Sequence, residues 1–100
     1  MRESLVEAYL VTKVQKIKNA SCLKWQSSRR GVPDRIVMLP IPEEHREIVA
    51  KYLRFIEVKA PGEKPTLQQA HVHSVFRDRG YRVDVVDSPK AIDEYLEELV

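Results

Sequence analysis

A strand, a helix and a second strand follow one another between residues 52 and 86, and this pattern constrains the fold more than any other part of the sequence. Residues 52–58, YLRFIEV, are apolar and rich in β-forming side chains, which is typical of a central strand. Thr66 is placed to cap a helix and Gly80 to end it. Residues 81–86, YRVDVV, alternate as a strand does. We therefore expect an α/β fold.

The remaining patterns complete the order α-β-β-β-α-β-α. The other expected elements are a helix over residues 4–17, strands over residues 21–26 and 34–39, and a last helix opened by Ser88 and Pro89. Ser4 and Glu7 fit an S-x-x-E capping box, which would start the first helix near Leu5. Residues 43–50 could form a short helical turn or part of a long hairpin connection, because their periodicity does not decide between the two.

The chain has 100 residues, of which 43% are hydrophobic, and this is enough for a single domain over residues 1–100 with one modest core. No apolar run of about 18 residues and no signal-like start are present, so we expect a cytoplasmic protein without membrane contact. Cys22 is the single cysteine and lacks a partner for a disulfide or a thiolate metal site. Both Cys22 and Trp25 are expected in the core.

Positive charge gathers in the first third of the chain. Residues 1–35 hold eight Lys and Arg against three Asp and Glu, although the net charge of the whole chain is only +2. Such a surface suits nucleic acid, because each cation that neutralises a phosphate releases counterions; a merely solvated surface is the alternative. The residues best placed to hold phosphates without reading sequence are Ser28, Arg29, Arg30 and Arg35.

Two carboxylates and an ammonium are expected to converge at one edge of the sheet. If strands 34–39 and 52–58 pair as an antiparallel hairpin, Asp34 lies beside Glu57. Lys59 follows Glu57 on the same face, because side-chain direction repeats every two residues. Two close carboxylates repel each other and are tolerated mainly with a cation between them, for which Mg²⁺ or Mn²⁺ is suited. The alternative is a structural ion pair between Lys59 and one of the acids.

This arrangement suits metal-assisted hydrolysis of a phosphodiester bond. The ion would polarise a phosphoryl oxygen and lower the pKa of a bound water, while Lys59 would orient or deprotonate that water. His71 and His73 stand two residues apart on the expected helix, so they point away from each other and cannot chelate one ion. Surface or semi-buried positions are expected for both histidines.

Pro33-Asp34 followed by Glu57-x-Lys59 resembles the signature of the PD-(D/E)XK nuclease superfamily, and the expected element order is similar to its common core. More closely, three segments of the chain resemble the VRR-NUC family of small virus-type and repair nucleases. These segments are GVPDRIVML, FIEVKAPGEKPTLQQ and RGYRVDVVDS. The resemblance covers about residues 31–88. It implies a restriction-endonuclease-like core, a mixed four-stranded sheet flanked by helices.

The resemblance also implies roles for matching residues. Asp34 and Glu57 would be catalytic metal ligands, with the carbonyl of Val58 as a third, and Lys59 would be the catalytic lysine. Glu7 matches an acid that many relatives place near the metal, and the capping box is its alternative role.

Gln69 matches a catalytic-site glutamine that supports the site from the helix after the second motif. Thr66 and Gln69 also form a capping box of their own, so Gln69 could serve only its helix start. The chain departs from many relatives at residues 40–51, where extra polar sequence separates the two motifs.

This chain resembles the stand-alone members of the family, which look like homodimeric enzymes that resolve four-way junctions. The resemblance therefore implies a metal-dependent, structure-selective DNA endonuclease of viral or mobile-element origin, a homodimer that cleaves four-way (Holliday) junctions in the host cytoplasm, with recombination or DNA repair as its setting. One alternative is a sequence-specific restriction-type or flap nuclease, and another is a non-catalytic nucleic-acid-binding module.

Overall fold

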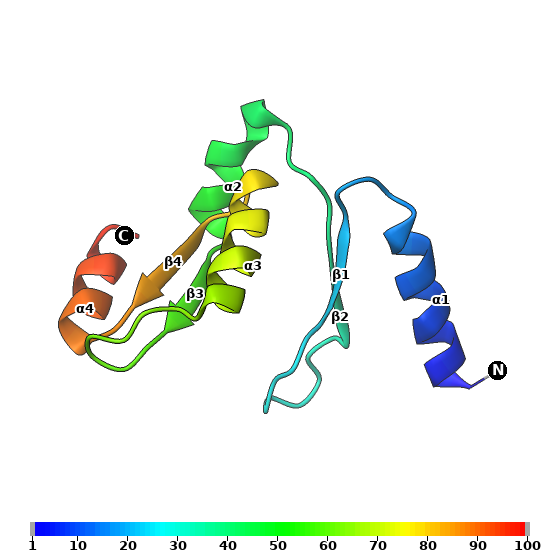
Figure 1. Cartoon of the computed structure of the whole chain (residues 1–100), viewed down its shortest axis with the longest axis horizontal. Helices are drawn as coiled ribbons and strands as arrows, with labels where there is room; N and C mark the ends of the chain where they lie inside the picture. The colour runs from blue at the N-terminus through cyan, green and yellow to red at the C-terminus, as the bar shows by residue number, and fades with distance from the viewer. Residues whose placement is uncertain (1, 100) are drawn as a thin grey trace. The chain divides into compact units, whose positions relative to one another are not determined.

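The computed structural model describes residues 2–99. The chain divides into two compact units, Met1–Pro40 and Ile41–Val100 (Figure 1). The first unit contains α1 (Glu3–Gln15), β1 (Ser21–Lys24) and β2 (Arg35–Met38). The second contains the 3-10 helix η1 (Glu43–His45), then α2 (Arg46–Tyr52), β3 (Phe55–Val58), α3 (Leu67–Asp78), β4 (Val83–Val86) and α4 (Pro89–Glu97). The expected α/β class is confirmed.

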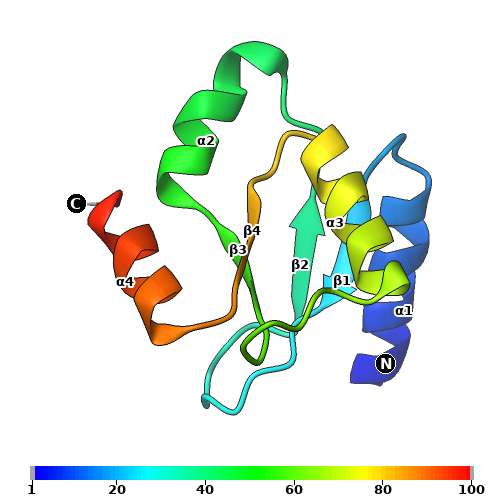
Figure 2. The same ribbon diagram turned by 60° about the vertical axis from the view of Figure 1, so that its left-hand side comes forward.

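In the first unit, β1 and β2 form an antiparallel pair (Figure 2). Lys24 lies opposite Arg35 in this pair. The ladder continues one step beyond β1, because the backbone N–H of Trp25 donates to the carbonyl of Asp34 at 2.9 Å. Asp34 is thereby fixed at the loop end of the hairpin, directly before β2. Trp25 is 45% exposed, so its expected place in the core is wrong: it stands at the end of a two-stranded ladder, where little covers it.

α1 begins without the expected capping box. Its N-cap is Arg2, and no side chain caps the helix. Ser4 therefore already lies inside the helix, where its hydroxyl cannot act as the N-cap acceptor. The carboxylate of Glu7 instead accepts a hydrogen bond from Nε of Arg35 at 2.6 Å. The capping role for Glu7 is wrong, because its partner comes from a strand that is distant in sequence.

In the second unit, β3 and β4 form a parallel pair, with Phe55 opposite Val83 and Val58 opposite Val86. α3 is the crossover helix between them and packs against β4 (Figure 1). Val83 and Val86 are buried beneath this layer. The pairing expected between residues 34–39 and 52–58 would join the two units, and it is not among the strand pairs formed within either. The four-stranded sheet therefore stays a prediction.

The connection before β3 is helical, which resolves the alternative left open for residues 43–50. α2 extends to Tyr52 and Leu53 is its C-cap, so the strand expected over residues 52–58 begins only at Phe55. Arg46 of α2 lies against the end of α3, where Gly80 has φ of 102°. A Cβ on Gly80 would stand 2.8 Å from Nε of Arg46, so glycine is required there for both space and conformation.

Both expected helix caps in the second unit are confirmed. Thr66 and Gln69 form a full capping box: Oγ1 of Thr66 accepts from the Gln69 N–H at 3.1 Å, and Oε1 of Gln69 accepts from the Thr66 N–H at 3.0 Å. Oγ of Ser88 accepts from the N–H of Ala91 at 3.0 Å, with Pro89 in the first turn. These local signals fix where α3 and α4 begin.

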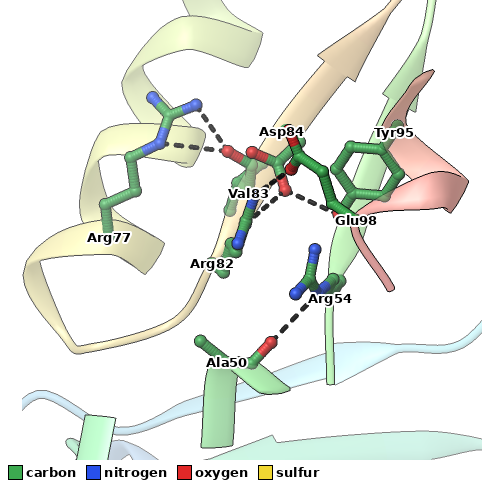
Figure 3. Close-up of polar contacts among 8 residues, drawn as sticks. All are labelled: Ala50, Arg54, Arg77, Arg82, Val83, Asp84, Tyr95 and Glu98. Carbon is green, nitrogen blue, oxygen red and sulfur yellow. Dashed lines mark hydrogen bonds and ion pairs between the residues drawn. The ribbon is translucent and has the colours of Figure 1, made fainter. Parts of the chain in front are cut away.

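A polar cluster attaches α4 to the start of β4 (Figure 3). Asp84 accepts hydrogen bonds from the hydroxyl of Tyr95 at 2.7 Å and from Nε of Arg82 at 2.8 Å. The hydrogen bond with Asp84 raises the pKa of Arg82 above its ordinary value. The guanidinium groups of Arg54 and Arg82 lie 5.4 and 5.7 Å from the centre of the Tyr95 ring, within cation–π range. Tyr95 thus links helix and strand by polar and aromatic contacts.

Cys22 is half-buried and has a free thiol. Within residues 2–99, none of the helices combines the length and the apolar character needed to cross a membrane.

Candidate active site

The first unit brings Glu7 and Asp34 to one pocket, although 27 positions separate them in the sequence. The pocket has a volume of about 320 Å³. Its lining residues are Glu3, Val6, Glu7, Leu10, Asp34 and Arg35. It forms because α1 packs on the β1–β2 hairpin, with Asp34 at the loop end of that hairpin, directly before β2. Two of the expected metal ligands therefore line one acidic pocket.

Arg35 provides the positive charge in this pocket. Its Nε lies 2.6 Å from Oε2 of Glu7, and the two side chains are 23% and 31% exposed. Arg35 was expected to contact DNA, and the structure shows it engaged with an acid of its own unit. This contact offsets part of the repulsion among the pocket's carboxylates.

The second unit presents Glu57 and Lys59 on one half-buried face of β3 and its extension. Phe55, Glu57 and Lys59 are half-buried and alternate with exposed Ile56 and Val58, so the expected two-residue repeat is confirmed. The backbone N–H of Lys59 donates to a β4 carbonyl at 2.9 Å, which keeps this residue in line with the strand.

Glu57 lies in a pocket of about 210 Å³ whose lining is otherwise almost entirely apolar. The lining residues are Phe55, Ile56, Glu57, Val72, His73, Phe76 and Val83. Nε2 of His73 is 3.2 Å from Oε1 of Glu57. His73 is 8% exposed, so the expected surface or semi-buried place for it is wrong: α3 turns this side chain inward against β3.

The carbonyl of Val58 points away from β4. The backbone N–H of Phe55 donates to the carbonyl of Arg82, just before β4, at 3.0 Å, and that of Lys59 donates to the carbonyl of Val86, at the end of β4, at 2.9 Å. Backbone polar groups of neighbouring residues in a strand point to opposite edges, so those of Val58 face the other side of β3. No strand within residues 41–99 pairs on that side. Within the described residues of the second unit no strand covers this carbonyl, which is the one that the resemblance implies as a metal ligand.

Two contacts fix the register of α3 along β3. The rings of Phe55 and Phe76 meet edge to face with centroids 5.3 Å apart, and one step further along the strand Glu57 meets His73. The helix and the strand therefore run in opposite directions here.

Continued by one step, this register would bring Gln69 to the level of Lys59. One turn of helix advances about 5.4 Å and two residues of strand about 6.6 Å, so the two elements stay nearly in step. Gln69 is half-buried, and its Oε1 belongs to the capping box. The cap is thus confirmed, and the register also favours a place for Gln69 near the lysine.

Ser28, Arg29 and Arg30 are exposed in the loop between β1 and β2. The backbone N–H of Arg29 donates to Oγ of Ser27 at 3.1 Å, which orders the loop locally. Their DNA contacts stay a prediction.

The expected acidic ligands are divided between the two units, with Glu7 and Asp34 in one and Glu57 in the other. Among residues 2–99, no group of three or more His, Cys, Asp or Glu side chains is gathered as a metal site. The donors present are nonetheless carboxylate and carbonyl oxygens, which are the ligands that Mg²⁺ and Mn²⁺ prefer. The chemistry of the donor set fits a hard divalent ion.

His73 is the functional candidate that sequence reasoning missed. Its signal was present, because it stands four residues after Gln69 and so shares a helix face with it.

Comparison with known proteins identifies the family of the chain. The model of the VRR-NUC domain matches residues 2–90. A phage protein named "Putative nuclease p44", from Acyrthosiphon pisum secondary endosymbiont phage 1, is 41% identical over 88 residues, which span 88% of this chain and 85% of the relative. No solved structure matches. The family expected from the two motifs is confirmed, and the chain belongs to the VRR-NUC domain family.

Proposed function

We propose that this protein is a divalent-metal-dependent DNA endonuclease that selects its substrate by structure and, as a homodimer, cleaves four-way junctions. The observation that carries the proposal is the family match over residues 2–90, which includes Asp34, Glu57 and Lys59. The phage relative named as a nuclease supports it and favours action in the cytoplasm of a host cell.

The proposed ligands of Mg²⁺ or Mn²⁺ are the carboxylates of Glu7, Asp34 and Glu57 and the carbonyl of Val58. The proposal includes the restriction-endonuclease-like core, since Asp34 and Glu57 must serve one ion. A bound divalent ion supplies positive charge to a phosphoryl oxygen and lowers the pKa of a coordinated water. The acidic pocket of the first unit and the outward carbonyl of Val58 support this assignment.

Lys59 orients the attacking water or takes its proton in this proposal. Its place two residues after Glu57, on the same face of the strand, puts its ammonium next to the ligand set. Gln69, one register step along α3, holds the lysine or the water in place. Pro61 and Gly62 turn the chain away directly after the site, which leaves room for a phosphate.

Exposed cations hold the DNA by its backbone. Ser28, Arg29 and Arg30 lie in the loop just before Asp34, where contacts to phosphates would place a strand beside the metal. Arg35 contributes less, because it is engaged with Glu7. A single metal site cuts one strand at a time, and two sites about a two-fold axis cut a junction symmetrically.

The test compares cleavage of linear duplex, flap and four-way junction DNA in Mg²⁺ or Mn²⁺ by the wild type, Lys59→Ala and the control Lys64→Ala. Lys64 is an exposed lysine in the following loop. We expect preferential junction cleavage, a loss of about 100-fold or more in rate for Lys59→Ala, and no change for Lys64→Ala.

Several outcomes would overturn parts of the proposal. Junction binding without cleavage in either metal would identify a non-catalytic binding module. Cleavage of linear duplex at a fixed sequence would identify a restriction-type enzyme, and preference for flaps would remove the junction assignment. Wild-type rates in Lys59→Ala would remove the proposed role of the lysine. A monomeric mass in solution, with and without junction DNA, would contradict the homodimer.

A further inference from the structure

His73 is the one buried polar side chain found in residues 2–99. The walls around it are aliphatic and aromatic, and Glu57 supplies its side-chain hydrogen bond. Burying an imidazole among apolar side chains is energetically costly unless its polar atoms form hydrogen bonds. The 3.2 Å contact therefore offsets the cost of burying both His73 and Glu57. Such a residue at this position calls for a role beyond packing, because an apolar side chain would fill the same space.

We infer that His73 is a positioning residue that orients the Glu57 carboxylate for a divalent cation through the bond from Nε2–H to Oε1. The inference rests on the proposed function, since it assigns how one of the proposed ligands is held. A carboxylate oxygen only accepts hydrogen bonds, so the proton of this bond lies on Nε2 of His73. Oε1 is then engaged with the protein and Oε2 remains for the cation.

Orientation matters because the carboxylate torsion of a glutamate is broad and roughly two-fold. A donor at fixed distance removes this freedom before the cation arrives. Carboxylates that bind metals are themselves hydrogen-bonded in this way, and loss of such a partner typically weakens metal binding about 10- to 100-fold.

The donor is held on a rigid element. α3 is fixed at its start by the capping box of Thr66 and Gln69 and, one turn after His73, by the edge-to-face contact of Phe76 with Phe55. The imidazole therefore stands between two anchored points of the same helix. This arrangement makes the position of Oε1 depend on the fold of the second unit and not on a flexible loop.

The test measures the affinity of the full chain for MnCl₂ alone, without DNA, by isothermal titration calorimetry. The variants are His73→Leu, which removes the donor, and His73→Gln, which keeps an N–H donor at similar reach. His71→Leu is the matched control, since His71 is exposed on the same helix. Glu57→Gln reports whether Glu57 binds the cation at all.

We expect His73→Leu to weaken Mn²⁺ binding about 10- to 100-fold, His73→Gln to recover most of the loss, and His71→Leu to match the wild type. Circular dichroism and thermal unfolding establish that each variant is folded. Wild-type affinity in His73→Leu, with Glu57→Gln impaired, overturns the role of His73 and leaves the proposed function intact. Wild-type affinity in Glu57→Gln, or no binding by the wild type, overturns both.

A measurement on the wild type covers the case in which His73→Leu does not fold. Imidazole ¹H–¹⁵N spectra report each ring nitrogen, and addition of MgCl₂ should shift the Nε2 signal of His73 while leaving that of His71 unchanged. Equal shifts for both histidines, or none for either, would contradict the inference.

Discussion

Arg35 and Glu7 show how a single pair can serve both packing and a candidate site. The pair joins α1 to β2 at the wall of the pocket that Asp34 also lines. The short bond from Nε to a carboxylate oxygen is charge-assisted, and both groups are only partly exposed. Because the pair is partly exposed, solvent screens the attraction between the two charges, and this lowers their interaction energy.

A double-mutant cycle of Glu7→Gln and Arg35→Gln should therefore give a coupling energy of about 1 kcal/mol. Urea unfolding of the wild type, both single variants and the double variant measures it. The pair Arg46 and Glu43, 3.4 Å apart with the Glu43 side chain 88% exposed, is the control and should couple by less than about 0.5 kcal/mol. Equal coupling energies in the two cycles would contradict the prediction that the contact between Glu7 and Arg35 is the stronger of the two.

At the scale of elements, α4 depends on the hydroxyl of Tyr95, because this group bonds Asp84 of β4 (Figure 3). Tyr95→Phe keeps the ring near the guanidinium groups of Arg54 and Arg82 and removes only the hydrogen bond. We expect a loss of about 0.5–1.5 kcal/mol in the free energy of unfolding. Tyr52→Phe is the control, since Tyr52 is 78% exposed and should change stability by less than about 0.5 kcal/mol. Urea denaturation measures the free energy of unfolding of both variants. Equal losses for Tyr95→Phe and Tyr52→Phe would contradict the proposed role of the Tyr95 hydroxyl in holding α4 to β4.

Element starts were predictable where the signal is local. Thr66 and Ser88 cap their helices as the sequence predicts, because a cap needs only the next three residues. The capping role considered for Glu7 and the surface place expected for His73 were wrong for the opposite reason: their partners, Arg35 and Glu57, lie on strands 28 and 16 positions away. Contacts across a fold are set by packing, which a pattern of neighbours does not record.

The shared face of Glu57 and Lys59 was predictable because the strand repeat is itself local. Glu57 and Lys59 share a face of β3 for that reason. α2 was not predictable with the same certainty, since seven residues give two turns at most and too little periodicity to separate helix from loop.

For the whole molecule, the uneven charge along the chain predicts how DNA binding depends on salt. Positive charge is concentrated in residues 1–35, while residues 65–100 carry four Lys and Arg against seven Asp and Glu. If the exposed Arg29 and Arg30 each neutralise a phosphate, each releases counterions from the DNA. The logarithm of the binding constant then falls with the logarithm of salt by about 0.9 per contact.

Replacing both arginines, Arg29→Ala with Arg30→Ala, should therefore reduce the steepness of this dependence by about 1.8, in addition to weakening binding. Fluorescence anisotropy of a labelled four-way junction, recorded between 50 and 200 mM NaCl in EDTA so that no strand is cut, gives the slope. Lys90→Ala removes an exposed cation at the start of α4 and is the control, with an unchanged slope. A double variant whose slope equals that of Lys90→Ala would show that the β1–β2 loop does not touch phosphates, and the DNA would then have to be held by other cations of the first unit, among them Lys13, Lys16, Lys18 and Lys24.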